Sequence, residues 1–256
     1  MAAGRGKRVR VVTALGAVRG SLLATAKRHS GVIGSTVAVS TVAPEIVLTF
    51  DDGPAPPVTE QLSAVLAHAG ATATFFVLMT RVAAHASVLQ ELVKQGHEVA
   101  LHGVDHRRIT GRPYRELTEE FRRSKGDLED ITGVAVHWFR PPYGAQGSRA
   151  WLAARRSGLE PVMWNRSTRD SAHVDDAERF RAATAGARAG DILLAHDGFA
   201  ALQDGVDDGP EPHLDRSDLL ARVLGEYQRL GLAGRSMSDA LLQGTPVRRA
   251  WFSAAL

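Results

Sequence analysis

Two adjacent aspartates, Asp51 and Asp52, follow a short apolar stretch at 45–50 and precede a Gly-Pro turn. The β-branched and aromatic residues of that stretch predict a buried strand. Because neighbouring side chains on a strand point to opposite sides, one aspartate can bind a metal ion while the other faces a reacting water. Asp, Gly and Pro are also ordinary turn residues, so this segment alone is equally consistent with a structural turn.

Two histidines four residues apart, His102 and His106, follow a second predicted strand at 97–101. Their spacing places both imidazoles on one face of a helical turn, and a tight loop can do the same. Two His and one Asp form a common ligand set for catalytic zinc, with one position left open for water. Arg107 and Arg108 make the stretch polar and leave surface histidines as the alternative, but the preceding Asp-Asp pair favours a metal site.

Five segments, in this order and spacing, resemble the polysaccharide deacetylase family, the family 4 carbohydrate esterases with a NodB homology domain. They are residues 49–54, 73–77, 96–106, 139–144 and 190–197. The resemblance covers the chain from about 44 to 243. It implies a metal-dependent hydrolase that removes acetyl groups from N-acetylated sugars of a polysaccharide, such as peptidoglycan or a chitin-like glycan.

The resemblance also implies a metal centre and a base. Asp52, His102 and His106 would bind Zn2+, and the same ligand types accept Co2+, Ni2+ or Mn2+. Asp51 would take a proton from the attacking water, and Arg140 would orient and hold Asp51. Taken alone, Arg140 would be an ordinary surface charge; the surrounding motifs favour the catalytic role.

The remaining site residues come from the last two matching segments and from the stretch between them. By resemblance, His196 would protonate the leaving amine or alcohol, with Asp170 as its partner. The backbone N–H of Tyr143 would stabilise the oxyanion, Leu194 would line a pocket for the acetyl methyl group, and Pro141 would contact substrate. Without the other motifs, His196 would be an ordinary histidine at a strand end.

The chain departs from the family pattern at three positions. Gly103 stands where the family usually has Ser or Thr after the first metal histidine, so a supporting hydroxyl is lost and weaker metal binding is expected. Ser167 replaces a typical Asp, and Ser171 replaces a typical Trp that would wall one side of the substrate groove. Asp170, which supports the proposed acid, is retained.

Composition indicates a globular protein without affinity for nucleic acid. The 256 residues are 44% hydrophobic, contain no cysteine and carry a net charge of +3. Cysteine-dependent zinc sites and disulfides are thereby excluded, while the compartment stays open. Seven basic residues lie within 1–30, before the first acid, and without them 24 basic residues face 28 acidic ones. No basic stripe is interleaved with aromatic residues, and no apolar run could span a membrane.

The ends of the chain are predicted as tails around one domain at 44–243. Residues 1–41 read as a basic tail or a weak export sequence, because Arg19 interrupts the apolar stretch that an export sequence needs. Residues 244–256 read as a C-terminal tail. The family is often secreted or bound to the cell envelope, but the N-terminal pattern also allows a cytoplasmic protein.

Strands alternate with helices, which predicts a parallel sheet with helices outside it. Predicted strands are 45–50, 72–78, 97–101, 136–140, 159–164 and 191–195. Predicted helices are 58–69, 86–95, 114–131, 148–157, 176–187 and 215–230. The resemblance implies an α/β fold of one domain, a distorted (β/α)7 barrel of the NodB type. Each motif follows a strand, where such barrels build their active sites, and segment 201–216 is predicted as a loop near the site.

Two other functions fit the same residues. The first is hydrolysis of an O-acetyl ester, as on xylan, or of a small acetylated molecule, since both reactions pass through a similar oxyanion. The second is a catalytically inactive, metal-containing carbohydrate-binding protein. Asp51 together with His196 favours an enzyme, because a binding protein needs neither a base nor an acid. The sequence leaves the sugar and the oligomeric state open.

Overall fold

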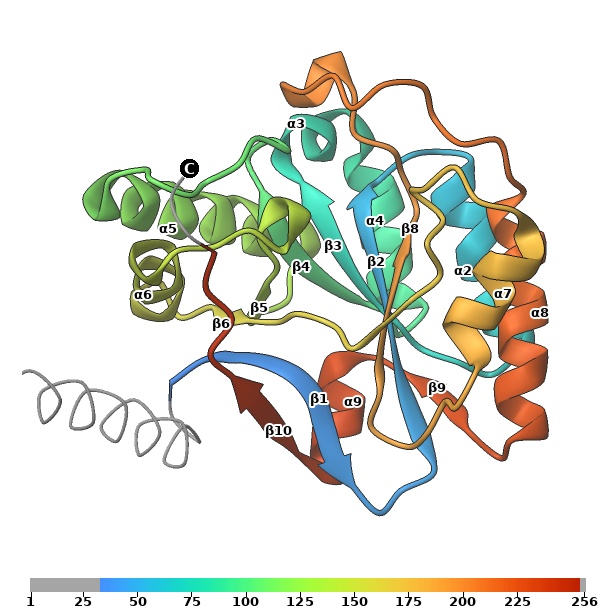
Figure 1. The fold of residues 1–256 in the computed structure, drawn as a ribbon. Helices are drawn as coiled ribbons and strands as arrows, with labels where there is room; N and C mark the ends of the chain where they lie inside the picture. Colours follow the sequence, from blue (N-terminus) through green and yellow to red (C-terminus); the bar gives the residue numbers. More distant parts are fainter. Residues whose placement is uncertain (1–32, 254–256) are drawn as a thin grey trace, which may run out of the picture.

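A curled, mostly parallel sheet surrounded by helices forms the centre of the molecule (Figure 1). The structure, a computed structural model, describes residues 33–253. The main sheet has the order β6-β5-β4-β3-β2-β8-β7, with β9 beside β2. Its strands are β2 (Glu45–Gly53), β3 (Thr74–Leu78), β4 (Glu98–Gly103), β5 (Trp138–Phe139), β6 (Glu160–Pro161), β7 (Arg166–Ser167), β8 (Ile192–His196) and β9 (Ala233–Arg235).

Helices cover the outer face of this sheet, except α9 (Met237–Leu242), whose Met237 and Ala240 pack with Val47 in a smaller apolar cluster on the inner face. The helices are α2 (Val58–His68), α3 (Met79–Val82), α4 (Ala86–Lys94), α5 (Tyr114–Thr132), α6 (Ser148–Arg156), α7 (Asp176–Thr184), α8 (Arg216–Arg229) and α9 (Met237–Leu242). Among residues 33–253, the short 3₁₀ turns are η1 (Ala83–His85), η2 (Pro142–Gly144) and η3 (Leu202–Asp204). The predicted single-domain distorted barrel is confirmed. The strands expected at 136–140 and 159–164 shrink to two residues each, and Pro161 at the end of β6 has no N–H to extend the pairing.

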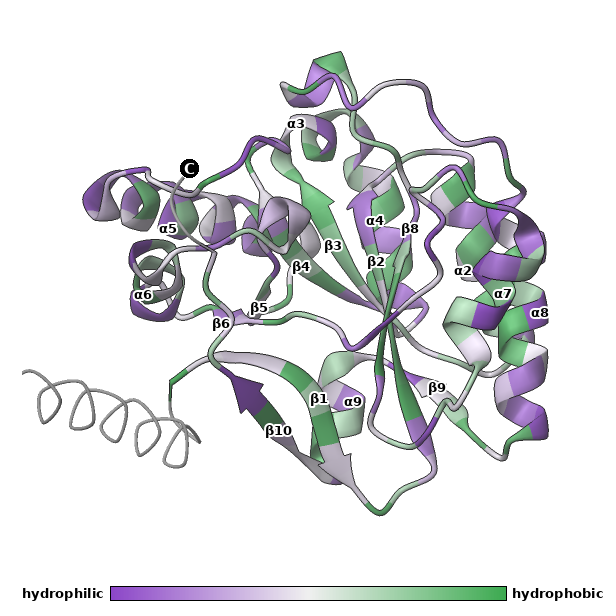
Figure 2. Ribbon diagram, viewed as in Figure 1, coloured by the Kyte–Doolittle hydropathy of each residue, from purple (hydrophilic) through white to green (hydrophobic). Residues whose placement is uncertain are grey.

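The alternation of side chains along the strands creates two apolar regions. On β2, Ile46 and Leu48 pack in the large cluster beneath the helices, while Val47 packs in a smaller cluster inside the curled sheet. Phe75 and Phe76 of β3 divide in the same way. Figure 2 shows the hydrophobic residues concentrated along these central strands. Strands buried on both faces hold their carboxyl ends in fixed relative positions.

The two predicted tails are partly wrong. β1 (Ser35–Thr41) pairs antiparallel with β10 (Gly244–Arg249), so neither 35–41 nor 244–249 is a loose tail. β1 also crosses the open side of the barrel, where Thr36 bridges Val162 and Ala38 bridges Asp191. The polar sequence of β10 has no apolar alternation, so its pairing depends on β1. Residues 1–32, with the basic cluster and the possible export sequence, lie outside the described residues.

All predicted motifs meet at one edge of the sheet. The carboxyl ends of β2, β4, β5 and β8 face the same side, as the parallel pairing requires. The segment after β8 crosses above these ends, at the top of Figure 1. Within residues 33–253, no helix is both long and apolar enough to cross a membrane.

We predict that Val39→Ala destabilises the fold although the sequence placed Val39 in a tail. Val39 is 4% exposed and belongs to the inner apolar cluster. Removing two buried methyl groups should lower the free energy of unfolding by roughly 1–3 kcal/mol. Urea denaturation measures the change.

Val42→Ala is the matched control, because Val42 is fully exposed three residues later. It should leave the urea midpoint nearly unchanged. Equal stability of both variants and the wild-type protein would show that β1 is not part of the cooperative fold.

Candidate metal-binding and catalytic site

A pocket of about 370 Å³ lies at the carboxyl edge of the sheet. Side chains from β2, β4 and β8 and from the loops that follow the strands line it. They are Asp51, Asp52, His102, His106, Tyr143, Gly144, Trp164, Ser171, Leu194, His196, Phe199, Ala200 and Asp208. The structure therefore brings together seven of the ten predicted site residues around one cavity.

A β-bulge at the end of β2 turns both aspartates toward the pocket. Asp51 pairs with Phe76 and Gly53 pairs with Val77, so Asp52 is the extra residue on its strand. Its φ of 73° lies in the left-handed region, which Asp tolerates better than most residues. The expectation that the two carboxylates point to opposite sides of a regular strand is thus wrong. The bulge places both at the same cavity and still separates their contacts.

Three ligand atoms converge beside the bulge. Oδ1 of Asp52 lies 3.3 Å from Nε2 of His102 and 3.3 Å from Nε2 of His106. All three side chains are buried, and Oδ1 of Asp52 has no hydrogen-bond partner. Two ligands of a tetrahedral zinc ion, each about 2.0–2.1 Å from the metal, are themselves about 3.3 Å apart. The donor set therefore fits a divalent cation, as the sequence predicted.

The protonation states of the three ligands also suit a cation. Nδ1 of His102 donates to the carbonyl of Arg140 at 2.8 Å, which leaves the Nε2 lone pair facing Asp52. Burial lowers the pKa of His106 despite the nearby charge of Asp52, and so favours the neutral ring. Burial alone would raise the pKa of Asp52, but His102 and the charges of His196, His102 and His106 hold it well below its usual value.

Asp51 is held by a buried arginine. Nη1 of Arg140 donates to Oδ1 of Asp51 at 2.7 Å, and Arg140 has no exposed surface. Its other nitrogens donate to the carbonyls of Val162 and Met163, both at 3.2 Å, and its guanidinium lies over the ring of Phe76. Because all three guanidinium nitrogens donate hydrogen bonds, Arg140 is a rigid internal group and not a surface charge. It orients Asp51 while the second carboxylate oxygen stays on the pocket side.

His196 is held by a buried carboxylate in the same manner. Nδ1 of His196 lies 2.7 Å from Oδ1 of Asp170, and the backbone N–H of His196 donates to Oδ2 at 2.8 Å. Burial by itself lowers the pKa of His196, but the charge and hydrogen bond of Asp170, with smaller effects of Asp52 and Asp51, raise it to about 9. The imidazolium form is therefore favoured at neutral pH in the metal-free protein.

The three residues predicted to bind substrate take different positions. Leu194 of β8 and Tyr143 of η2 line the pocket. Tyr143 has a φ of 58°, and its ring centroid lies 4.3 Å from that of His106. Pro141 is buried and is not among the lining residues; its carbonyl accepts the N–H of Gly144 and so shapes the turn. A direct contact of Pro141 with substrate is not supported by this geometry.

Several lining residues were not predicted as site residues from the sequence. Trp164 and Phe199 add aromatic surface, and Ser171 occupies the position of the expected Trp. Asp208 comes from the segment 201–216, so the predicted loop near the site is confirmed. The abundance of Asp, Gly and Pro in that segment indicated a loop, but only the fold shows which aspartate reaches the pocket.

The backbone conformation at position 103 explains why a glycine occupies it. Its φ of 150° lies in the region that favours glycine, and an added Cβ would come within 2.8 Å of the carbonyl of Asp105. A Ser or Thr at this position would therefore require the loop to change. The glycine at this position is thus matched to the backbone path between His102 and His106.

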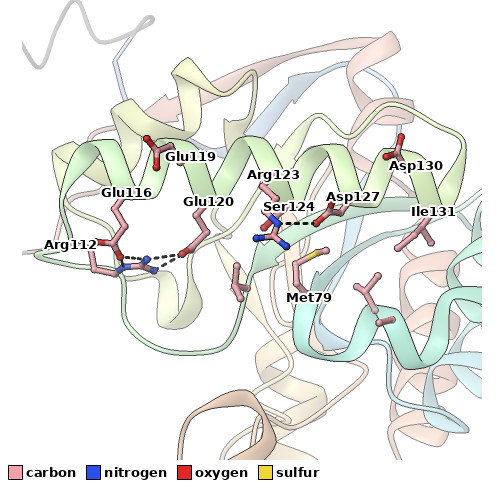
Figure 3. A pocket seen from close by; sticks show the side chains of 13 residues that line it. Met79, Arg112, Glu116, Glu119, Glu120, Arg123, Ser124, Asp127, Asp130 and Ile131 are labelled. Carbon is pink, nitrogen blue, oxygen red and sulfur yellow. Dashed lines mark hydrogen bonds and ion pairs between the residues drawn. The ribbon is translucent and has the colours of Figure 1, made fainter.

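A larger hollow of about 990 Å³ lies along α5 and α3, away from these residues (Figure 3). Its acidic side chains are partly neutralised from within, since Arg112 bonds both Glu116 and Glu120. No histidine and none of the predicted site residues line this hollow. Its side chains lack the base, acid and ligand set that the smaller pocket combines.

We predict that Asp170→Asn lowers the pKa of His196 from about 9 toward its ordinary value, because the negative charge on its Nδ1 partner is removed. NMR titration of the His196 ring in metal-free protein measures this. Asp176→Asn, an exposed change at the start of α7, should leave that pKa unaltered.

The pH dependence of the unfolding free energy gives a second test of the His196–Asp170 pairing. Because the folded pKa of His196 exceeds its ordinary 6.5, its pairing stabilises the metal-free protein below pH 6.5 and this contribution disappears as pH rises through about 9. The difference in unfolding free energy between wild type and Asp170→Asn should therefore shrink from pH 6 to pH 9.5. A constant difference would contradict the pairing.

Comparison with known proteins agrees with this geometry. The polysaccharide deacetylase family model matches residues 38–162. The chitooligosaccharide deacetylase of Azorhizobium caulinodans is 31% identical over 168 residues, which cover 65% of this chain and 80% of the relative. A peptidoglycan-N-acetylglucosamine deacetylase of Bacillus cereus is 30% identical over 201 residues, covering 77% and 87% respectively.

Solved structures share the fold at lower identity. A family 4 carbohydrate esterase from Streptomyces lividans, in complex with acetate, superimposes with a TM-score of 0.66 at 23% identity, over 81% of this chain and 99% of that one. A CE4 family pseudoenzyme from Bacillus anthracis gives a TM-score of 0.69 at 17% identity, over 80% and 68%. The structural likenesses show the fold, and the sequence matches show that the chain belongs to the polysaccharide deacetylase family of hydrolases.

Proposed function

We propose that this chain is a metal-dependent hydrolase that removes acetyl groups from N-acetylated sugars of a polysaccharide, either peptidoglycan or a chitin-like glycan. One observation carries the proposal: the Asp51–Arg140 pair and the His196–Asp170 pair both reach the pocket that holds the Asp-His-His ligand set. The names of the relatives, which include chitooligosaccharide and peptidoglycan deacetylases, support the same substrate class.

Asp52, His102 and His106 would hold the metal, with Zn2+ as the first choice and Co2+, Ni2+ or Mn2+ as alternatives. A divalent ion bound there would polarise an acetyl carbonyl and lower the pKa of a water molecule. One carboxylate with two neutral imidazoles leaves most of the positive charge of the ion uncompensated, which suits both effects.

Asp51 would act as the general base. Its Oδ1 is bound by Arg140, and its Oδ2 lies 3.9 Å from Nε2 of His102. A water placed between Asp51 and the carbonyl carbon of the substrate could pass its proton to this carboxylate as it attacks. The rigid contact with Arg140 keeps the carboxylate in one orientation through that step.

His196 would act as the general acid. Its Nδ1 is engaged by Asp170, so the Nε2 hydrogen is the one available to the pocket. That hydrogen would pass to the sugar nitrogen as the carbon–nitrogen bond breaks, which releases acetate and a free amine. The N–H of Tyr143 would donate to the oxyanion that forms in between, and Leu194 would face the acetyl methyl group.

The walls of the pocket bear on substrate choice. Ser171 replaces the bulky side chain that the family resemblance predicts, while Trp164 and Phe199 provide other apolar surface in the same cavity. The pocket thereby keeps an aromatic contact for a sugar ring. An O-acetylated sugar or a small acetylated molecule would use the same catalytic groups, so substrate tests must include them.

We predict that zinc-loaded protein releases acetate from chito-oligosaccharides or peptidoglycan, and that chelator-stripped protein does not until zinc is restored. Acetate is measured enzymatically, with acetylated xylan and small acetylated sugars in the same panel. Release from xylan alone would favour the O-acetyl esterase. Bound zinc without release from any substrate would favour the inactive carbohydrate-binding protein.

We predict that Asp51→Asn and His196→Asn each lower kcat by about 10²–10⁴-fold, the usual contribution of a positioned base or acid. Metal content and circular dichroism should stay near wild type, which separates lost catalysis from lost folding. Asp127→Asn is the matched control, because Asp127 lines the hollow in Figure 3 and not the site pocket. Unchanged kcat in Asp51→Asn would overturn the assigned base.

A further inference from the structure

The two metal histidines differ in what holds their second nitrogen. Nδ1 of His102 is bound by the carbonyl of Arg140 at 2.8 Å. Nδ1 of His106 is buried and has no hydrogen-bond partner. Metal-binding histidines almost always donate their other N–H to a carboxylate, a carbonyl or water, which sets the tautomer and the ring orientation. His106 therefore lacks a contact that its proposed role requires.

Asp208 is placed to supply that contact. Its Oδ2 lies 3.6 Å from Nδ1 of His106, and the same oxygen accepts a hydrogen bond from the hydroxyl of Tyr143 at 2.7 Å. The ring of Tyr143 packs against His106, so all three side chains form one cluster at the pocket rim. A shift of about 0.7 Å would bring the Nδ1–Oδ2 distance to the usual 2.9 Å.

The loop that carries Asp208 is anchored beside His106. Asp204, four residues earlier, is fully buried and accepts two hydrogen bonds from Arg81, at 3.0 and 2.6 Å, and one from Thr80 at 2.8 Å. The carbonyl of Asp204 also accepts the backbone N–H of His106 at 2.9 Å. This anchor ties the two segments together, so the approach of Asp208 to His106 is set by the fold.

We propose that Asp208 is a positioning residue for the metal centre: it accepts the Nδ1 hydrogen of His106 and links that ligand to Tyr143. The inference rests on the metal site of the proposed function and adds a residue outside the predicted site. The carboxylate makes the opposite nitrogen, Nε2, a better donor to a cation. Through the hydroxyl of Tyr143, it also connects the ligand to the turn whose N–H is the proposed donor to the oxyanion.

The test compares Asp208→Ala and Asp208→Asn with Asp207→Ala. Asp207 is an exposed neighbour on the same loop, and its change removes the same charge without touching His106 or Tyr143. Zinc affinity is measured by competition with a chelator, which needs no substrate. We expect Asp208→Ala to weaken zinc binding about 10–100-fold, the usual effect of losing such a partner, and Asp208→Asn to weaken it less.

The outcomes separate this inference from the function on which it rests. Tight zinc binding by wild type, with equal affinity in Asp208→Ala, would overturn the role of Asp208 and leave the metal site intact. Equal weakening by Asp207→Ala would also overturn it, because loop charge alone would explain the effect. Failure of the wild-type protein to bind any of Zn2+, Co2+, Ni2+ and Mn2+ would overturn both.

A second measurement gives its decisive result in the wild-type protein, which avoids the question of whether a variant folds. In zinc-loaded wild type, nitrogen-15 NMR of the His106 ring should show the Nδ1–H tautomer with a hydrogen protected from exchange. In Asp208→Ala that hydrogen should exchange rapidly, while the corresponding hydrogen of His102, bound to Arg140, keeps its protection. An unprotected Nδ1 hydrogen in wild type would contradict the proposed bond.

Discussion

The buried guanidinium of Arg140 is the group on which the site depends. It binds Asp51 and the hydroxyl of Thr49 through one nitrogen, while its own carbonyl holds His102. A single residue thereby orients both the proposed base and a proposed metal ligand. Burial lowers the pKa of Arg140, although the charge and hydrogen bond of Asp51 oppose that effect. Loss of one partner of such a buried pair typically costs about 3–5 kcal/mol, so the catalytic geometry and the stability of the core are coupled.

The second charged pair gives the pocket its chemical asymmetry. Asp51 is paired with the permanent cation Arg140, whereas His196 is paired with the anion Asp170. Burial excludes water, whose high dielectric constant would otherwise weaken the electrostatic interaction within each pair. The proposed metal ligands line the same pocket as Asp51 and His196, so a cation bound there would lie near both the proposed base and the proposed acid.

The barrel is completed by segments far apart in the chain. β1 and β10 pair with each other, and β1 also bridges Val162, next to β6, and Asp191, next to β8. On the opposite edge, the Arg81–Asp204 ion pair holds the loop after β8 over the metal histidines. The β1–β10 pairing and the Arg81–Asp204 ion pair both stabilise a pocket that the parallel strands alone would leave open. They explain how a sheet with two-residue strands at its margins can carry a rigid site.

The sequence by itself predicted the alternating strands and helices, the edge where the motifs meet and the ligand set of Asp52, His102 and His106. Those features depend on local patterns and on short motifs whose order along the chain is visible. Only the tertiary structure revealed the bulge that turns Asp52, the β1–β10 pairing, the withdrawn position of Pro141 and the approach of Asp208. Each of these depends on contacts between distant segments, and no local periodicity encodes which residues such contacts bring together.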